Sequence, residues 1–488
     1  MARISMAAIA AIALTGFCGV AQAQGLIDFV NDPATNASEL QMAAGTAVQK
    51  TCSQLASEAG GPAAALAGAL GPVKTDLFLR CNEMVQTSND LLGRPGTARS
   101  LGYEDRDQLL AAIQQVSGEE ISAQGSLSTQ VSAGQFANIG GRLNALRLGT
   151  RSAGSSGFVA DLADDPQQIA SRARRGSGAS ADVADVSNPI GWFLESSYGF
   201  GDHDQTDNED AFDFDAVSVT TGADYNFGSG VAGISVGFDR YKADFSDGLL
   251  VSGGDVEVEG VSGSLFASWF GNHWSLSGIG TYGSLSSDVS RVAQYASENS
   301  SCALGCGTDR VLTGSPDGDY VALGITLGYQ ISAGGWDIVP SLGAVYRDVN
   351  IDGYTELDSM NGGLALQYGD QEIKSTRSIV TVSFSRPISR SFGVLVPNLQ
   401  LEWHHEFEDD VRALQAKYAA DTTSATCAGA VSCFTFLTDQ PESDFGVASL
   451  GLSAVFARRV QAYFIYEALL GVQNLTSNSI AIGLRGQF

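Results

Sequence analysis

Between residues 190 and 488 this chain alternates apolar and polar side chains in one short segment after another. In the last segment the apolar face carries Ile480, Ile482, Leu484 and Phe488. Strand side chains alternate between two faces with a period of two. After residue 23 no apolar run is long enough for a transmembrane helix. Because only helices and closed barrels satisfy every backbone group in lipid, the pattern predicts a membrane-spanning β-barrel.

The alternation divides this region into twelve strands, an even number such as single-chain bacterial barrels have. We expect the strands at 192–200, 214–225, 232–245, 256–270, 274–289, 320–331, 336–349, 378–387, 394–407, 445–456, 460–469 and 479–488.

The connections between these strands alternate in length. Those after the second, fourth, sixth, eighth and tenth strands are short, and those after the first, third, fifth, seventh and ninth are longer. In bacterial barrels short turns face the periplasm and long loops face the exterior. Two close cysteine pairs, Cys302 with Cys306 and Cys427 with Cys433, both fall in long connections. Their placement agrees with a single outer face.

The N-terminus has the pattern of a secretory signal peptide. A positive residue, Arg3, precedes the apolar stretch 6–20, and Ala21-Gln22-Ala23 forms an A-x-A site. We expect residues 1–23 to be removed by cleavage between Ala23 and Gln24, so that the chain is exported.

Residues 24–150 have a different pattern, because their apolar residues recur at helical spacing. Leu109, Ile113 and Val116 form one stripe; Phe136, Ile139, Leu143 and Leu146 form another. We expect a small helical domain here, followed by a flexible tether at 151–189. The second stripe is interpreted either as domain core or as a helix inside the barrel, and 165–175 is the other candidate for that helix.

The fold class is therefore α + β: a small helical N-terminal domain followed by a 12-stranded antiparallel transmembrane β-barrel at 190–488. Six cysteines remain after the signal peptide, an even number that suggests three disulfides in an oxidising compartment. Six cysteines allow 15 pairings. The close spacings favour local loop staples, which leaves Cys52 with Cys81. No histidine lies near these pairs, which argues against a metal site.

The chain carries 54 acidic and 27 basic residues, a net charge of −27. This balance argues against nucleic acid as a partner. Nothing in the sequence indicates a cofactor. A barrel of this kind has the lipids of the outer membrane as partners, and no surface ligand can be named from the sequence.

The sequence resembles the translocator barrels of autotransporters. The likeness covers 190–488 and is carried by the run from Pro397 to Phe407, with 444–453, 463–467 and 483–488 continuing the pattern. The resemblance implies a twelve-stranded barrel that anchors an N-terminal passenger, with a helix of the tether in the pore. It also implies that Phe488 is the signal read by the barrel-assembly machinery. The chain lacks an Asn-Asn pair at the junction, where some autotransporters cut themselves, so we expect the N-terminal part to stay attached.

Catalytic machinery is not evident. The four histidines are all outside 24–188, so that region alone cannot build a Ser-His-Asp or Cys-His site. A G-x-S-x-G match, Gly233 to Gly237, falls inside an expected strand, whereas the nucleophile elbow needs a strand-to-helix turn. Alternation places the side chains of five residues in the lumen: Gln400, Glu402, His404, Glu406 and Arg485. We interpret them as polar wall residues and expect no enzyme.

The stretch 202–210 crowds acidic residues into one connection. Its spacing does not fit an EF-hand, because Thr206 stands at a ligand position and no glycine follows. We expect a solvated acidic loop, with loose binding of divalent cations as the alternative.

These features together predict an outer-membrane protein of autotransporter type. Its barrel anchors a short uncleaved helical domain, and a stronger version of the prediction is that the barrel also translocates this domain. The first alternative is a resident barrel, such as a porin, an adhesin or a structural protein, with a periplasmic N-terminal domain. The second is an outer-membrane lipid hydrolase.

Overall fold

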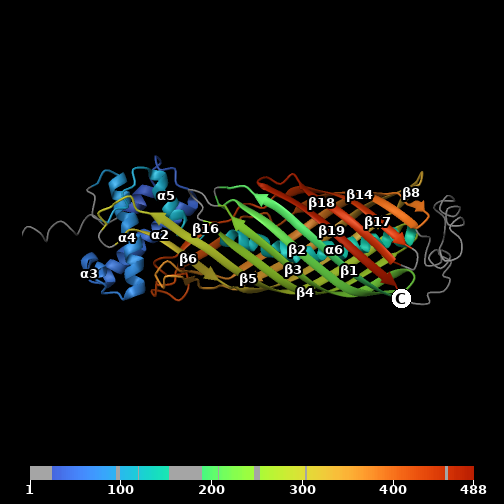
Figure 1. Cartoon of the computed structure of the whole chain (residues 1–488), viewed down its shortest axis with the longest axis horizontal. Helices are drawn as coiled ribbons and strands as arrows, with labels where there is room; N and C mark the ends of the chain where they lie inside the picture. The colour runs from blue at the N-terminus through green and yellow to red at the C-terminus, as the bar shows by residue number, and fades with distance from the viewer. Residues whose placement is uncertain are drawn as a thin grey trace, which may run out of the picture.

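The structure is a computed structural model of the 488-residue chain. It describes residues 25–94, 99–118, 120–152, 189–206, 208–246, 253–302, 305–456 and 460–487. Figure 1 shows a long β-barrel with a group of helices at one end and a further helix inside it.

The barrel consists of twelve long antiparallel strands within the described ranges. Each pairs with the next, and the first pairs with the last from Gly191 opposite Gln487 to His203 opposite Leu475. This confirms the predicted fold class. The strands are β1 (Ile190–His203), β2 (Phe212–Asn226), β3 (Gly230–Phe245), β4 (Gly254–Phe270), β5 (Trp274–Ala296), β7 (Asp317–Tyr329), β9 (Trp336–Ile351), β12 (Gln371–Ser385), β14 (Gly393–Glu406), β17 (Asp444–Phe456), β18 (Val460–Leu470) and β19 (Leu475–Gln487).

The outer surface of the barrel is apolar. Along β7, Leu323, Ile325 and Leu327 are all exposed, and Ile482 and Leu484 are exposed on β19. Large exposed side chains of this kind recur on neighbouring strands, which is the lipid-facing band of a transmembrane barrel. Several strands are longer than expected: β5 continues to Ala296, and β12 begins already at Gln371. Their backbone pairing continues beyond the part of the strand whose outer face is apolar.

The connections differ at the two ends of the barrel. At one end, called here the turn end, they are short, and their described residues include the small strands β8 (Ile331–Ala333) and β13 (Ile388–Arg390). At the other, called the outer end, the long connections build β6 (Gly307–Gly314), β10 (Leu357–Asp358) and a separate sheet. This sheet joins β11 (Leu366–Tyr368), β15 (Ala413–Tyr418) and β16 (Phe434–Leu437).

Within the part of the chain that the structure describes, five helices sit against the outer end (Figure 1) and are called here the cap. Ser38 and Asp105 begin two of them with capping boxes, each side chain accepting from the helix backbone while a glutamine reaches back. The helices are α1 (Gly25–Val30), α2 (Glu39–Glu58), α3 (Pro62–Leu66), α4 (Pro72–Leu91) and α5 (Arg106–Gln114).

The sixth helix, α6 (Ile121–Ser152), enters the barrel at the outer end and runs along the lumen (Figure 1). It has 32 residues, so it is roughly 48 Å long. Among the helices that the structure describes, none combines the length and the apolar character needed to span a membrane.

The position of α6 differs from the expected domain boundary. The last thirty or so residues of the range 24–150, which we assigned to the helical domain, lie in the lumen, so the pore helix precedes the tether at 151–189. Of the two candidate pore segments, the one with Phe136, Ile139 and Leu143 is inside the barrel. The other, 165–175, lies outside the described residues.

Glycines on the inner wall let α6 approach closely. A Cβ on Gly324 would stand 2.4 Å from the Phe136 ring, and one on Gly260 would stand 2.5 Å from a methyl carbon of Val131. A Cβ on Gly263, which faces outward on β4, meets nothing within 4 Å.

Substitution of one wall glycine tests this packing. Gly324→Leu forces Phe136 and α6 away from the wall, and such overpacking costs about 1–3 kcal/mol. We expect folded full-length protein to lose its compact form in detergent gels at a lower temperature. Gly263→Leu is the matched control and keeps the wild-type transition; equal transitions for both variants would contradict the packing.

Candidate functional site

The contact between α6 and the barrel wall is the first part of the candidate site. Gln135 donates to Asp239 at 2.9 Å and accepts from Thr220 at 2.9 Å. Asn138 donates to Thr220 at 2.7 Å and to Ser218 at 3.0 Å. All five side chains are buried. Hydrogen bonds that satisfy buried groups on both sides fix the rotation of the helix, because a turned helix would leave them unpaired.

The helix does not lie at the centre of the lumen. It packs against β2 to β5, and a cavity of about 1050 Å³ remains along β12, β14, β17, β18 and β19. The wall residues named from the sequence lie on this side: Gln400, Glu402, His404 and Glu406 all line the cavity. These polar side chains form one wall of the cavity, and apolar side chains such as Phe212, Val345 and Ile465 line other parts of it.

Most polar groups of that wall are occupied by one another. Gln400 donates to Glu402 at 2.6 Å, and His404 lies 2.7 Å from the same carboxylate. Glu406 pairs with Arg377 at 2.7 Å. Arg485, the fifth lumen candidate, lies 3.3 Å from Asp224 on β2, an ion pair across the seam between β19 and β1. The two arginine ion pairs link different strands of the barrel wall.

His404 is the natural candidate for catalysis in the lumen, and its geometry can be examined directly. Its Nε2 faces Glu402, its ring stacks on Phe445 at 4.8 Å, and its Nδ1 has no hydrogen-bond partner among the described residues. A serine or cysteine nucleophile would need to lie within hydrogen-bond reach of one ring nitrogen. The described hydrogen bonds to this ring include no such group.

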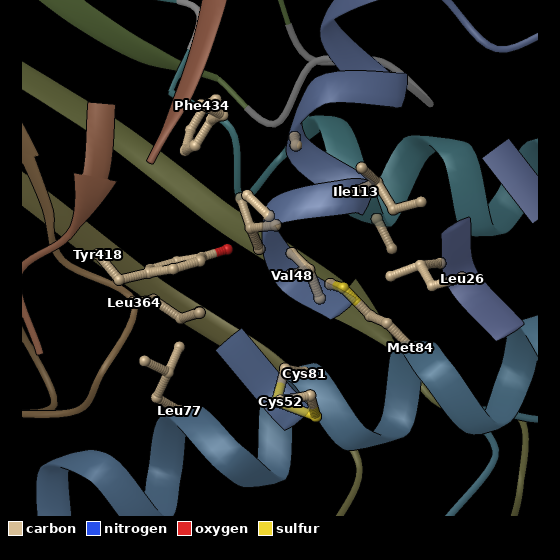
Figure 2. Close-up of a cluster of buried hydrophobic side chains, with 14 of the residues drawn as sticks. Leu26, Val48, Cys52, Leu77, Cys81, Met84, Ile113, Leu364, Tyr418 and Phe434 are labelled. Atoms are coloured by element: carbon tan, nitrogen blue, oxygen red, sulfur yellow. A yellow bond between two sulfur atoms is a disulfide. The ribbon is translucent and has the colours of Figure 1, made fainter. Parts of the chain in front are cut away.

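The second part of the candidate site is the junction between cap and barrel. Figure 2 shows Leu77 of α4 and Val48 of α2 facing Leu364, Tyr418 and Phe434. The last three belong to the long connections and strands of the outer end. All five side chains are buried in one apolar cluster. The cap and the outer loops therefore share one apolar core.

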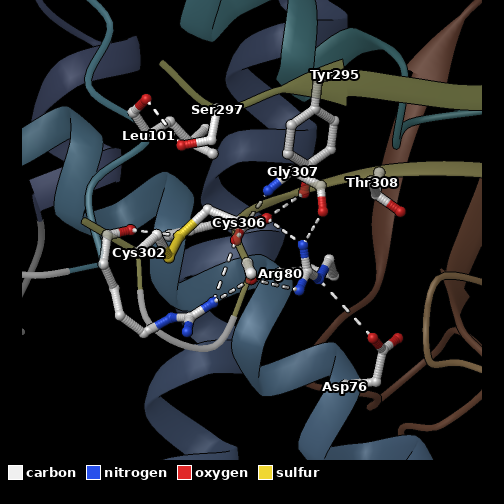
Figure 3. A network of polar contacts seen from close by, with 12 residues as sticks. Asp76, Arg80, Leu101, Tyr295, Ser297, Cys302, Cys306, Gly307 and Thr308 are labelled. Carbon is white, nitrogen blue, oxygen red and sulfur yellow. Dashed lines mark hydrogen bonds and ion pairs between the residues drawn. A yellow bond between two sulfur atoms is a disulfide. The ribbon is translucent and has the colours of Figure 1, made fainter. Parts of the chain in front are cut away.

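A buried carboxylate joins the cap to the barrel at one edge of this core. Glu83 of α4 is fully buried and accepts from Arg80 at 2.9 Å, from Arg99 at 3.3 Å and from Tyr295 at 2.8 Å. Tyr295 belongs to β5, so the network spans cap and barrel. Arg80 also donates to the carbonyl oxygen of Gly307, next to the disulfide in the β5–β6 connection (Figure 3).

Two further arginines make ion pairs at the same junction. Arg310 of β6 lies 2.8 Å from Asp76 of α4 and 2.8 Å from Asp358 of β10. Arg291 of β5 makes a bidentate pair with Glu356 at 2.6 and 2.8 Å, both almost wholly buried. Removing one partner of such a pair leaves an uncompensated buried charge, which costs about 3–5 kcal/mol.

Six cysteines of the described residues form three disulfides. Cys52 bonds to Cys81 between α2 and α4, and the other two bonds join Cys302 to Cys306 and Cys427 to Cys433 within outer loops. Phe488 and the expected cleavage site at Ala23 and Gln24 lie outside the described residues.

Sequence reasoning missed the shared core. The loop residues Leu364 and Leu366, and Phe434 and Phe436, alternate with other residues in connections that we expected to be plain outer loops. Their apolar side chains could have indicated that these connections are buried, because exposed loops rarely carry such apolar runs.

Comparison with known proteins identifies the barrel. The family model described as "Autotransporter beta-domain" matches residues 192–467. The chain belongs to the autotransporter β-domain family. It is an outer-membrane barrel with an N-terminal passenger region, and its local disulfides belong to that passenger and to the outer loops.

Individual relatives match over limited parts. Esterase EstA of Pseudomonas aeruginosa is 28% identical over 180 residues, which are 36% of this chain and 26% of EstA. An uncharacterised protein of Pseudomonas putida is 29% identical over 158 residues, 32% of this chain and 24% of that protein. The chain thus spans about a quarter of the length of these relatives. The translocator domain of the autotransporter NalP from Neisseria meningitidis is 16% identical with a TM-score of 0.46, covering 68% of this chain and 99% of that one.

The autotransporter cap carries a pH-sensitive group at its base. Glu120 directly precedes α6 and is 7% exposed. Burial raises its pKa to about 7; Arg291 opposes the shift, while Asp210 and Glu356 add to it. The folded state therefore favours the protonated acid. This contribution to stability is complete below the ordinary pKa near 4.5 and is lost as the pH rises through about 7.

We expect the helical signal of the full-length protein to resist urea better at about pH 5 than at about pH 8. The free energy of unfolding should be higher at the lower pH by up to roughly 3 kcal/mol. Glu120→Gln should remove most of this difference, measured by far-ultraviolet circular dichroism. Glu39→Gln, at an exposed position of α2, is the control and keeps it. An unchanged pH dependence in Glu120→Gln would contradict the assignment.

Proposed function

We propose that this autotransporter displays its own N-terminal region as an uncleaved cap on the cell surface. The observation that carries the proposal is the path of α6, which enters the lumen at the outer end directly below the cap. The barrel anchors the region, and the helix in its lumen holds it in place.

The two kinds of connection support a cap that lies outside the cell. Long connections of bacterial barrels face the exterior and short turns face the periplasm. The cap packs against the long connections, through Leu364, Tyr418 and Phe434. Gly191, near the start of β1, pairs with the last described residue, Gln487, near the turn end. An N-terminal region left in the periplasm would lie at that end instead.

Retention follows from the shared core. A passenger that is released after cleavage must be stable once it leaves the barrel. Here α2 and α4 bury apolar side chains against the outer loops, and Glu83 accepts hydrogen bonds from Tyr295 and Gly307 of the barrel. Separation would expose this core and break those hydrogen bonds, so we propose that cap and barrel work as one body.

We further propose that the chain acts without catalysis. The cap contains no histidine, and His404 in the lumen is paired with Glu402. EstA is named an esterase, but it matches only 180 residues of this chain, so its name assigns no activity here. Outer-membrane lipids contact the apolar band, and the barrel-assembly machinery would read Phe488. Cleavage of residues 1–23 during export belongs to the same proposal.

The test is surface exposure of the N-terminus. An epitope tag is inserted just after Gln24, and protease is added to intact cells, with a periplasmic marker protein as the control for leakage. We expect the tag to be lost while the marker survives, because the cap lies outside.

A tag that is digested only after the outer membrane has been opened would contradict the proposal. It would leave the N-terminal region in the periplasm and support a resident barrel such as a porin. The same blot also tests retention, because a cleaved cap would appear as a fragment much shorter than the full chain.

A further inference from the structure

Three side chains from distant parts of the chain meet at the outer rim of the lumen. His203 is the last residue of β1, Glu209 lies in the β1–β2 connection, and Asp439 lies in the connection between β16 and β17. His203 Nε2 is 4.0 Å from Glu209 Oε2 and 3.8 Å from Asp439 Oδ2. The three ligand atoms all lie within 4.8 Å of one another.

Neighbouring groups orient both carboxylates. Asp439 Oδ1 accepts a hydrogen bond from the Thr206 hydroxyl at 3.0 Å, and Glu209 Oε1 accepts one from the Asp439 backbone N–H at 3.4 Å. The second oxygen of each carboxylate is the one that faces the imidazole. Metal-binding carboxylates commonly have one oxygen held in this way by a surrounding hydrogen bond.

The imidazole is also held in place. Its ring stacks on Phe212 with centroids 5.0 Å apart and planes 8° from parallel. The side chain of Glu209 is 7% exposed and that of His203 is 11% exposed. Glu209 Oε2 accepts no hydrogen bond from the described residues, although its side chain is more than nine-tenths buried. The oxygen is aimed at the space between His203 and Asp439.

The local charge favours a cation. Asp202 and Asp204 flank the histidine, and their charges act on it together with that of Asp439. Among the described residues, Arg412 is a cation whose charge acts on Glu209, and its guanidinium also donates to Gln371 at 3.2 Å. Two ionised carboxylates beside an imidazole attract a positive charge.

We propose that His203, Glu209 and Asp439 bind a divalent transition-metal cation of the zinc type. One imidazole nitrogen and two carboxylate oxygens are a donor set that suits zinc, whereas calcium takes oxygen ligands. Ligands around tetrahedral zinc are roughly 3.4 Å apart, which follows from bonds of about 2.1 Å. The observed 3.8 and 4.0 Å need only small side-chain rotations to reach that spacing. All three residues line the cavity, so water can supply a fourth ligand.

The site differs from the sequence expectation of no metal site, and from the loose acidic loop considered as an alternative. Of the stretch 202–210 it uses His203 and Glu209, while its third ligand is more than two hundred residues away. A bound cation would join the β1–β2 connection to the β16–β17 connection. It would thereby fix two outer loops beside the mouth of the lumen.

The test uses the full-length protein in detergent, stripped with a chelator and titrated with Zn²⁺ against a chromophoric chelator. We expect one tight site in the wild type, and at least tenfold weaker binding in His203→Ala and in Asp439→Asn. His405→Ala is the matched control, because His405 also pairs with an aspartate, Asp444, at 3.0 Å. It should bind zinc as the wild type does.

Each variant is first checked for the compact folded form in detergent gels, and Asp439→Asn serves if His203→Ala does not fold. Equal zinc binding by wild type and Asp439→Asn would overturn the proposal, as would the absence of a tight site in the wild type. Displacement of zinc by an equal concentration of Ca²⁺ would also contradict it, because calcium competes poorly for an imidazole ligand.

Discussion

Closure of the sheet by pairing β1 with β19 is the constraint on which the rest of this structure depends. In lipid, every backbone N–H and C=O must find its partner within the protein, and a closed barrel has no unpaired edge. The register from Gly191 to His203 along this seam provides that closure. A closed barrel also creates an interior whose wall residues are half polar, and that interior must be filled by water or by protein.

In this chain α6 fills the part of the interior next to β2 to β5, and the way it packs sets the position of the helices before it. Wall glycines such as Gly260 and Gly324 bring the helix close, and Gln135 and Asn138 fix its rotation through buried hydrogen bonds. Because α6 begins at the outer rim, the residues that precede it must fold there. The cap therefore meets the long connections, and the two form a common core around Leu364.

Much of the barrel could be predicted from the sequence, because lipid on one side and a polar lumen on the other impose alternation on every strand. The same alternation places Glu402 and His404 on the inner wall, where they lie. The occupant of the lumen could not be chosen in advance, since the stripe of Phe136 and Ile139 suits a domain core equally well. The cap–loop contacts could not be predicted either, because they join residues far apart in the sequence.

The same reason explains why the zinc site was not predicted. His203 and Glu209 are near neighbours in the chain, but Asp439 reaches them only through the closed barrel, which brings the first and later connections to one rim. Alternation along single strands carries no information about such a meeting. Long connections on the outer end thus have two roles here: they complete the core of the cap, and they supply ligands at the mouth of the lumen.

The central claim is that cap and outer loops are one folding unit, and hydrogen exchange in the full-length protein tests it most directly. Leu364→Ala removes a buried loop side chain from the shared core, whereas Leu357→Ala changes an exposed leucine of the same connection. The account predicts faster exchange in α4 as well as in the loop for Leu364→Ala, and wild-type exchange for Leu357→Ala. Faster exchange confined to the loop, with α4 fully protected, would show that the cap is stable by itself and would contradict the account.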